Sequence, residues 1–194
     1  LQSRCEFPLG INVRGEVVWL DLSDSNSCHI LVGGTTGSGK SIFLQAMIEY
    51  LHRHYKTEQL RFLIIDPKQI TYTMFEQLSH LQYPIIRNKE KAIDALELLV
   101  KEMDQRYKLF HKHPGVNDIV QYNKINSEKP IARWIVVFDE YADYMTDKKF
   151  KDIIEGSFER LGYMARAAGI HLVIALQRPD AKTVSTRIRS NLPG

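Results

Sequence analysis

The chain has 194 residues, of which 44% are hydrophobic and 25% are charged, and its formal net charge is +3. This balance predicts one α/β domain with a substantial core and excludes a disordered chain. The two cysteines, Cys5 and Cys28, show neither a disulfide framework nor a cysteine-rich zinc pattern, so we expect reduced thiols and a cytoplasmic setting.

The first 27 residues have the composition of strands and turns, with proline and glycine interrupting the segment. We predict a small β hairpin over residues 1–27 that leads into a core over residues 28–194. The chain starts without Met and stops at Gly194 with no final element, so we expect a piece of a longer polypeptide, truncated at its C-terminus. No apolar run is long enough to span a membrane and no signal peptide opens the chain, so we expect no membrane contact from this portion.

A glycine-rich loop follows the first core strand, residues 28–32. Its sequence, Gly34-Thr35-Thr36-Gly37-Ser38-Gly39-Lys40-Ser41, has the spacing of a P-loop, and residues 41–54 have helical periodicity. The backbone N–H groups of such a loop and the N-terminus of its helix bind phosphate. We predict that all eight residues bind ATP, with Lys40 at the β- and γ-phosphates and Ser41 as a ligand of Mg²⁺. A chance glycine-rich turn is the alternative.

A second apolar run, residues 60–65, ends in Asp66-Pro67-Lys68. Continuous apolar runs are typical of buried parallel strands, and ligands bind beyond the carboxyl ends of such strands. Asp66 and Lys68 therefore follow a strand at the nucleotide edge. A turn that contains proline explains the same residues equally well.

A third buried strand, residues 134–138, ends in Asp139-Glu140, which is the Walker B pattern. Asp139 would bind the water shell of Mg²⁺, and Glu140 would orient and deprotonate the attacking water. Successive strand residues point to opposite sides, so we expect the two acids to diverge. Two solvated acids at a strand end are the alternative, but together with the P-loop the pair predicts ATP hydrolysis.

Helical periodicity marks residues 88–110, 116–125 and 148–168, and a fourth apolar strand covers residues 170–176. Gln177 follows this strand, where its neutral amide is a candidate sensor of the γ-phosphate. Strands that alternate with helices pair in parallel through right-handed crossovers. The predicted fold is therefore a doubly wound α/β P-loop core with a mostly parallel sheet flanked by helices.

These motifs resemble those of the FtsK/SpoIIIE translocase motor domain, within the FtsK–HerA group of ATPases. The resemblance runs along nearly the whole chain. Besides the P-loop it rests on Ile65-Asp66-Pro67-Lys68, Glu102-Met103-Asp104-Gln105-Arg106-Tyr107, Tyr122-Asn123, Val137-Phe138-Asp139-Glu140-Tyr141-Ala142-Asp143, Arg166-Ala167-Ala168-Gly169-Ile170-His171-Leu172 and Ala175-Leu176-Gln177-Arg178-Pro179. It implies a RecA-like P-loop NTPase fold, a homo-hexameric ring, and ATP hydrolysis coupled to movement along double-stranded DNA, in chromosome segregation or in a DNA-processing or phage-defence system.

The resemblance also implies roles for arginines outside the loop. Arg166 matches a position that is similar to a trans-acting arginine finger, which would reach the nucleotide of a neighbouring subunit. A solvated arginine at a helix end is the alternative, and Arg160 is the second candidate finger. Arg178 and Arg189 match positions that face the DNA channel. The stretch 178–189 holds four basic residues and one acid, which suits phosphate contacts, although a solvated basic tail has the same composition.

Two other functions fit the same motifs. A protein-export ATPase of the type VII secretion kind would move polypeptide, and a nucleotide-gated assembly scaffold would bind ATP without useful turnover. The pair Asp139-Glu140 disfavours the scaffold, and the basic stretch favours DNA over peptide.

Overall fold

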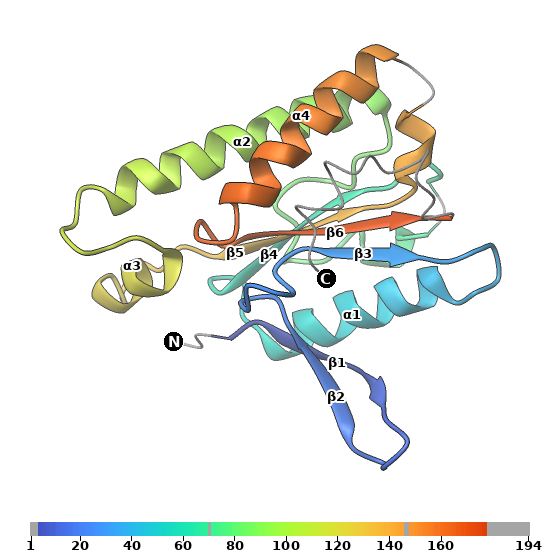
Figure 1. Cartoon of the computed structure of the whole chain (residues 1–194), viewed down its shortest axis with the longest axis horizontal. Coiled ribbons are helices and arrows are strands. Elements are labelled where there is room, and N and C mark those ends of the chain that lie inside the picture. The colour runs from blue at the N-terminus through green and yellow to red at the C-terminus, as the bar shows by residue number, and fades with distance from the viewer. Residues whose placement is uncertain (1–3, 70, 146–147, 178–194) are drawn as a thin grey trace.

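The core of the molecule is a four-stranded parallel sheet, seen in a computed structural model that describes residues 4–69, 71–145 and 148–177. The strands are β3 (Ile30–Gly33), β4 (Leu60–Ile65), β5 (Arg133–Phe138) and β6 (Ile170–Leu176), and they lie in the order β3-β6-β5-β4 (Figure 1). Every residue of β5 and β6 is buried, as expected for central strands of a parallel sheet. The predicted α/β fold is confirmed.

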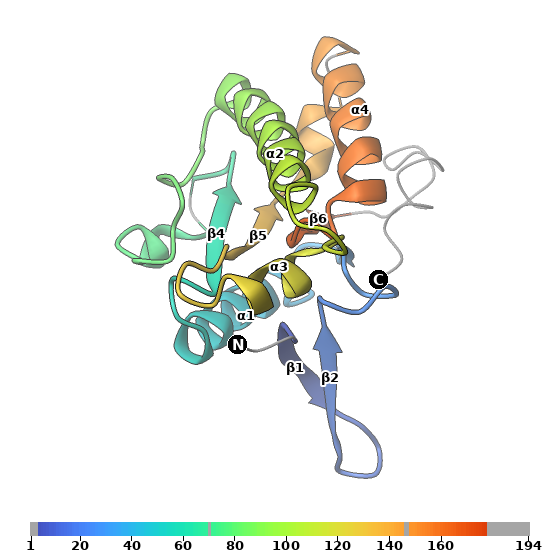
Figure 2. The ribbon, with the colours of Figure 1, turned by 90° about the vertical axis from the view of Figure 1, so that its left-hand side faces the viewer.

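Helices cover both faces of this sheet. Helix α1 (Lys40–His54) lies on one face, while α2 (Lys89–Phe110) and α4 (Lys148–Met164) pack together on the other, as Figure 2 shows from the side. The buried side chains form one apolar cluster on each face. The short helix α3 (Ile119–Ile125) adds a third, small cluster at the end of α2. None of the described helices is long and apolar enough to cross a membrane.

Helix α4 ends earlier than its periodicity predicts. It stops at Met164, and residues 165–169 form a turn before β6 begins. The Met164 carbonyl accepts the Tyr107 hydroxyl of α2 at 2.8 Å, and the Ala167 carbonyl accepts the Ile119 backbone N–H of α3 at 2.8 Å, so the end of α4 and the turn after it are held by the neighbouring helices. Gly169, with φ at +72°, then redirects the chain into the sheet. The predicted end at residue 168 is therefore wrong by one turn of helix.

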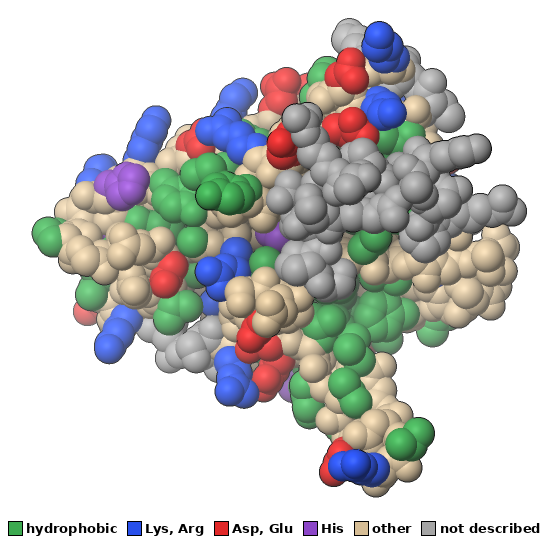
Figure 3. Space-filling view, viewed as in Figure 1, with side chains coloured by type: hydrophobic (Ala, Val, Ile, Leu, Met, Phe, Trp, Pro, Cys, Tyr) green, Lys and Arg blue, Asp and Glu red, His purple; other side chains and the backbone are tan. Residues whose placement is uncertain are grey.

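The predicted N-terminal hairpin is confirmed as β1 (Glu6–Ile11) paired antiparallel with β2 (Val17–Asp21). Its base is anchored in the α1 cluster through Cys5, Phe7 and Leu22, all almost fully buried. Its outer part projects from the body and carries exposed apolar side chains, visible in green in Figure 3. Because the base shares a core with α1, the predicted boundary after residue 27 stays a prediction.

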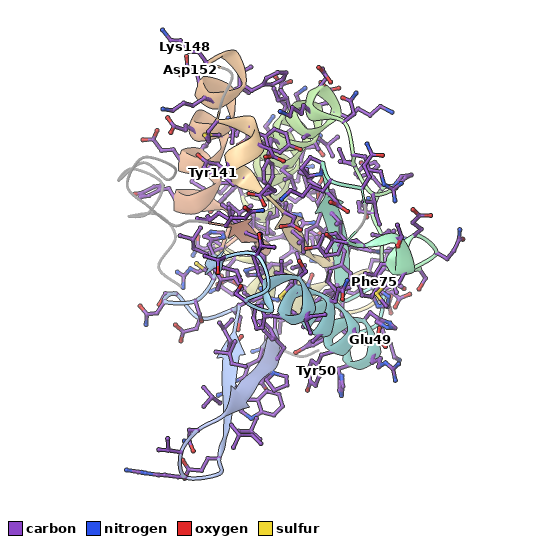
Figure 4. The ribbon with its side chains drawn as sticks, turned by 90° about the vertical axis from the view of Figure 1, so that its right-hand side faces the viewer. Glu49, Tyr50, Phe75, Tyr141, Lys148 and Asp152 are labelled. Atoms are coloured by element: carbon purple, nitrogen blue, oxygen red, sulfur yellow. The ribbon has the colours of Figure 1, made fainter. Side chains whose placement is uncertain are left out.

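Aromatic side chains connect the layers. Tyr50, near the C-terminal end of α1 in Figure 4, meets the ring of Trp19 on the hairpin edge-on, with centroids 6.0 Å apart. On the other face, Tyr141 of the 3₁₀ helix η2 (Tyr141–Tyr144) stacks on Phe158 of α4, with centroids 5.7 Å apart. A second 3₁₀ helix, η1 (Thr73–Phe75), follows β4. Both 3₁₀ helices follow strands whose carboxyl ends meet at one edge of the sheet.

Candidate nucleotide-binding site

The carboxyl ends of the strands enclose a cavity of about 400 Å³. The loop after β3, the turn after β4, the two acids after β5 and Gln177 after β6 all line it. The lining residues are Gly34, Thr35, Thr36, Gly37, Gly39, Lys40, Ser41, Ile42, Lys68, Thr71, Asp139, Glu140 and Gln177. The sequence-predicted nucleotide residues thus come together at one place, with Ser38 as the one member of the loop that is not in the lining.

The glycines of the loop are required by its geometry. Gly37 and Gly39 have φ values of +83° and +89°, a left-handed region that other residues rarely adopt. A Cβ on Gly34 would lie 2.2 Å from the Ser38 hydroxyl oxygen and 3.2 Å from the Ser38 Cβ, so Ser38 would have to shift to admit a side chain there. Gly39 is the N-cap of α1 and no side chain caps the helix, so the helix N-terminus faces the cavity with N–H groups suited to an anion.

Lys40 reaches across the cavity to both acids. Its Nζ lies 3.3 Å from Asp139 Oδ1 and 3.7 Å from Glu140 Oε2, and both carboxylates are almost completely buried. The predicted divergence of the acids is wrong, because β5 ends at Phe138 and Glu140 has a left-handed backbone, with φ +55°. Strand alternation therefore stops before Glu140, and the two acids share one lysine.

The turn after β4 supplies a second lysine. Lys68 Nζ lies 2.7 Å from Glu140 Oε2, and Tyr72 donates its hydroxyl to Asp139 Oδ2 at 3.2 Å. Asp66 instead accepts backbone N–H groups of its own turn and is buried. The two explanations of Asp66-Pro67-Lys68 therefore both hold, one for each charged residue: Lys68 lines the nucleotide cavity, and Asp66 shapes the turn.

Burial and the neighbouring acids determine the protonation states of Tyr72 and Lys68. Burial raises the pKa of the Tyr72 hydroxyl and the Asp139 carboxylate raises it further, so Tyr72 stays protonated and donates. Partial burial lowers the pKa of Lys68, but the hydrogen bond and charge of Glu140 outweigh it and raise the pKa overall. Lys68 is therefore a cation at neutral pH. Sequence reasoning missed Tyr72 because no charged or glycine-rich pattern marks it.

Ser41 and Asp139 offer oxygen donors of the kind that Mg²⁺ prefers. Both line the cavity, and Asp139 is held by Lys40 and Tyr72. Two protein oxygens are enough for an ion that usually keeps several of its waters. The donor set therefore fits Mg²⁺.

Arg166 lies at the opposite edge of the sheet. It is exposed in the turn before β6, whereas Gln177 follows the end of that strand, and seven strand residues separate the two edges by roughly 20 Å. It lines a separate polar cavity of about 540 Å³ together with Arg133 and Asp118. The second candidate, Arg160, forms an ion pair with Asp104 of α2, in which one guanidinium nitrogen, Nη2, lies 2.8 Å from both carboxylate oxygens.

Two side chains of α2 hold the turn that carries Arg166. The hydroxyl of Tyr107 donates to the Met164 carbonyl, and the Arg106 guanidinium donates to the Ala168 carbonyl, both at 2.8 Å. Arg106 is almost fully buried and also lies over the ring of Trp134. The backbone on both sides of Arg166 is therefore fixed from α2. The other predicted arginines, Arg178 and Arg189, lie outside the described residues.

Comparison with known proteins finds relatives along almost the entire chain. A model of the FtsK/SpoIIIE family matches residues 2–181. An uncharacterized FtsK-like protein of Nostoc sp. is 38% identical over 187 residues, which cover 96% of this chain and 26% of that protein. DNA translocase FtsK of Streptococcus pneumoniae is 37% identical over 197 residues, covering 97% of this chain and 25% of that protein. The chain thus spans about a quarter of the length of these relatives.

Solved structures share the fold. The conjugation coupling protein TcpA of pCW3, solved with ATPγS, superposes with a TM-score of 0.81 at 31% identity, over 97% of this chain and 52% of that one. The cytoplasmic domain of the type VII secretion ATPase EccC of Thermomonospora curvata gives a TM-score of 0.82 at 26% identity, over 98% of this chain and 23% of that one. The nucleotide analogue in the TcpA structure agrees with a nucleotide cavity in this fold.

Proposed function

The chain belongs to the FtsK/SpoIIIE family, and from that premise we propose that it is the ATP-hydrolysing motor of a double-stranded DNA translocase. The observation that carries the proposal is the single cavity in which the P-loop, Lys40, Asp139, Glu140 and Gln177 meet. Such a set can hold phosphates, activate a water and respond to loss of the γ-phosphate. The relatives named DNA translocase support DNA as the substrate.

Each residue has a distinct role in this proposal. The loop Gly34–Ser41 and the N-terminus of α1 bind the phosphates, and Lys40 exchanges its contact with the acids for the β- and γ-phosphates. Glu140 orients the attacking water and takes its proton. Gln177 contacts the γ-phosphate through its amide. Mg²⁺ held by Ser41, and through water by Asp139, would supply charge neutralisation on the phosphates.

We further propose that the active site is completed in a homo-hexameric ring. Arg166 cannot reach the cavity of its own chain, because it stands at the other edge of the sheet. It is exposed and held in place by α2, which suits a finger inserted into a neighbour. DNA contact by Arg178 and Arg189 remains a proposal from the sequence. A cytoplasmic location is also proposed, and the two free, buried cysteines agree with it.

ATP hydrolysis by the whole protein, measured with and without linear double-stranded DNA, tests the proposal. We expect DNA to stimulate turnover, and Lys40→Ala to abolish nucleotide binding. Glu140→Gln should still bind ATP while turnover falls by about 10²–10⁴-fold, the usual contribution of a general base. Unchanged phosphate release by Glu140→Gln would refute the assigned role. Removing Arg178 and Arg189 together should lower the DNA stimulation and the salt dependence of DNA binding.

A protein-export ATPase is the second candidate, and the likeness to the EccC cytoplasmic domain supports it. The same assay separates the two functions. Stimulation by a secretion-signal peptide, with no response to DNA, would favour export. ATP binding without turnover under either condition would favour the nucleotide-gated scaffold.

A further inference from the structure

We propose that Lys68 is a positioning residue for Glu140, and that the turn after β4 holds both acids of the cavity from the neighbouring strand. The inference rests on the proposed function, because it assumes that Glu140 acts on the attacking water. It adds to the site a residue from a different strand than the P-loop and the acids. Strand order explains how this is possible, since β4 lies directly beside β5 in the sheet.

The contact distances identify Lys68 as the main partner of Glu140. Lys68 Nζ is 2.7 Å from Glu140 Oε2, whereas Lys40 Nζ is 3.7 Å from the same oxygen. A carboxylate that is almost fully buried needs a charged partner, because an unpaired buried charge is strongly destabilising. Lys68 satisfies this need and leaves Lys40, which is closer to Asp139, able to turn to a phosphate.

The turn that carries Lys68 is fixed at both ends. Asp66 accepts the backbone N–H groups of Gln69 and Thr71, each at 3.2 Å, and the Thr71 carbonyl accepts the amide of Gln45 from α1 at 2.6 Å. Gln69 has φ +63°, a conformation that the turn must hold against its ordinary preference. The turn is therefore connected to the P-loop helix and to its own strand.

Tyr72, at the far end of the same turn, holds the other acid. Its buried hydroxyl donates to Asp139 Oδ2 at 3.2 Å, while Lys40 contacts the other oxygen of that carboxylate at 3.3 Å. The turn thus contributes one side chain to each acid, Lys68 to Glu140 and Tyr72 to Asp139. Misplacement of a reacting group by about 1 Å can cost 10²-fold in rate, so the two contacts bear directly on turnover.

A direct contact between Lys68 and a phosphate is the competing role, because Lys68 also lines the cavity. The two roles differ in what a variant changes. A phosphate contact adds to nucleotide affinity whether or not residue 140 is a carboxylate. A positioning residue acts through Glu140, so its effect falls on kcat and disappears once Glu140 has been replaced.

The test compares Lys68→Met, Lys68→Arg and the control Lys101→Met in the whole protein. Lys101 is exposed on α2 and lies outside the cavity lining. We expect Lys68→Met to lower kcat by about 10-fold to 10²-fold, with ATPγS affinity changed less than about threefold. Its unfolding midpoint should fall below that of the control, because Glu140 then keeps only the more distant Lys40 as a charged partner, so the rates are compared well below the unfolding transition. Lys68→Arg should recover most of the rate because it keeps the charge. The double variant Glu140→Gln with Lys68→Met should have the same kcat as Glu140→Gln alone.

Two results would overturn the positioning role of Lys68 while leaving the proposed function intact. One is an unchanged kcat in Lys68→Met while Glu140→Gln is inactive. The other is a loss of ATPγS affinity of about tenfold or more that persists in the Glu140→Gln background, which would make Lys68 a phosphate contact. Normal turnover by Glu140→Gln itself would overturn the proposed role of Glu140, and the inference with it.

Discussion

Replacing Gly169 with alanine tests how tightly the turn before β6 is fixed. Gly169 has φ +72°, and a Cβ there would lie 2.4 Å from Cδ1 and 3.1 Å from Cγ2 of Ile119. The left-handed backbone costs an alanine about 1–2 kcal/mol. Forced overpacking costs about 1–3 kcal/mol more. Gly169→Ala should therefore lower the free energy of unfolding by about 2–5 kcal/mol.

Urea unfolding measures this loss, and two further variants locate its cause. Gly156→Ala is the matched control, because Gly156 lies inside α4 and a Cβ there meets nothing within 4 Å. It should stabilise the protein by about 0.5–1 kcal/mol. Ile119→Ala removes the two clashing carbons and leaves the Ile119 Cβ at 3.4 Å, an ordinary contact. In the double variant the loss of unfolding free energy should then be about 1–3 kcal/mol smaller than the sum of the two single losses. The cost of the left-handed backbone at residue 169 should remain.

The same variants separate stability from function. The nucleotide cavity is at the other edge of the sheet, so ATPγS binding below the unfolding transition should be unchanged in Gly169→Ala. DNA-stimulated turnover should fall, because the turn presents Arg166. Two results would refute the reasoning about the turn: a stability change equal to that of Gly156→Ala, or additive effects of Gly169→Ala and Ile119→Ala.

Two further predictions concern Arg166 and pH. Arg166→Ala should lower turnover by about 10³-fold or more without loss of ATPγS binding. Mixing Arg166→Ala subunits with Glu140→Gln subunits should restore part of the activity, because a Glu140→Gln subunit supplies the missing arginine to the intact site of its neighbour. Mixtures that stay inactive would contradict action in trans. Burial, aided by the charge of Arg166, lowers the pKa of His29 to about 4 from an ordinary 6.5. Below about pH 6.5 the unfolded chain binds a proton at His29 that the folded chain excludes, so the free energy of unfolding should fall by about 3 kcal/mol as the pH drops from 6.5 towards 4. Urea midpoints measured across this range should fall less steeply in His29→Asn, and equal slopes would count against the burial of a neutral His29.

The sequence was sufficient for the parts of the site that depend on neighbours along the chain. The P-loop spacing, the two acids and Gln177 each follow an apolar strand, and parallel strands bring their carboxyl ends to one edge. The direction of Glu140 was not predictable, because its left-handed backbone breaks strand alternation just after β5 ends. The early end of α4 was not predictable either, because it depends on contacts far along the chain: α2 side chains donate to the Met164 and Ala168 carbonyls, and the α3 backbone donates to the Ala167 carbonyl.

Polar pairs between residues far apart in the chain could not be predicted from the sequence. Lys68 and Glu140 are 72 positions apart, and they meet only because β4 is the neighbour of β5 in the sheet order. Alternation of strands and helices predicts parallel pairing but does not rank the possible orders. The buried pair His29 and His171 shows the same limit. His29 accepts the Leu172 backbone N–H at 3.0 Å, a structural contact that no local pattern around His29 indicates.

The charge balance of the cavity explains why an arginine from outside would matter. Among the described lining residues the charged side chains are two lysines and two acids, so their formal charges cancel. A nucleoside triphosphate with its Mg²⁺ still carries net negative charge, and hydrolysis moves more of it onto the γ-phosphate oxygens. The loop N–H groups and the helix dipole favour that charge in the ground state, but they add no full positive charge in the transition state. A guanidinium supplied by the neighbouring subunit, as we propose, would provide it, and this would make turnover depend on assembly while leaving nucleotide binding to the single chain.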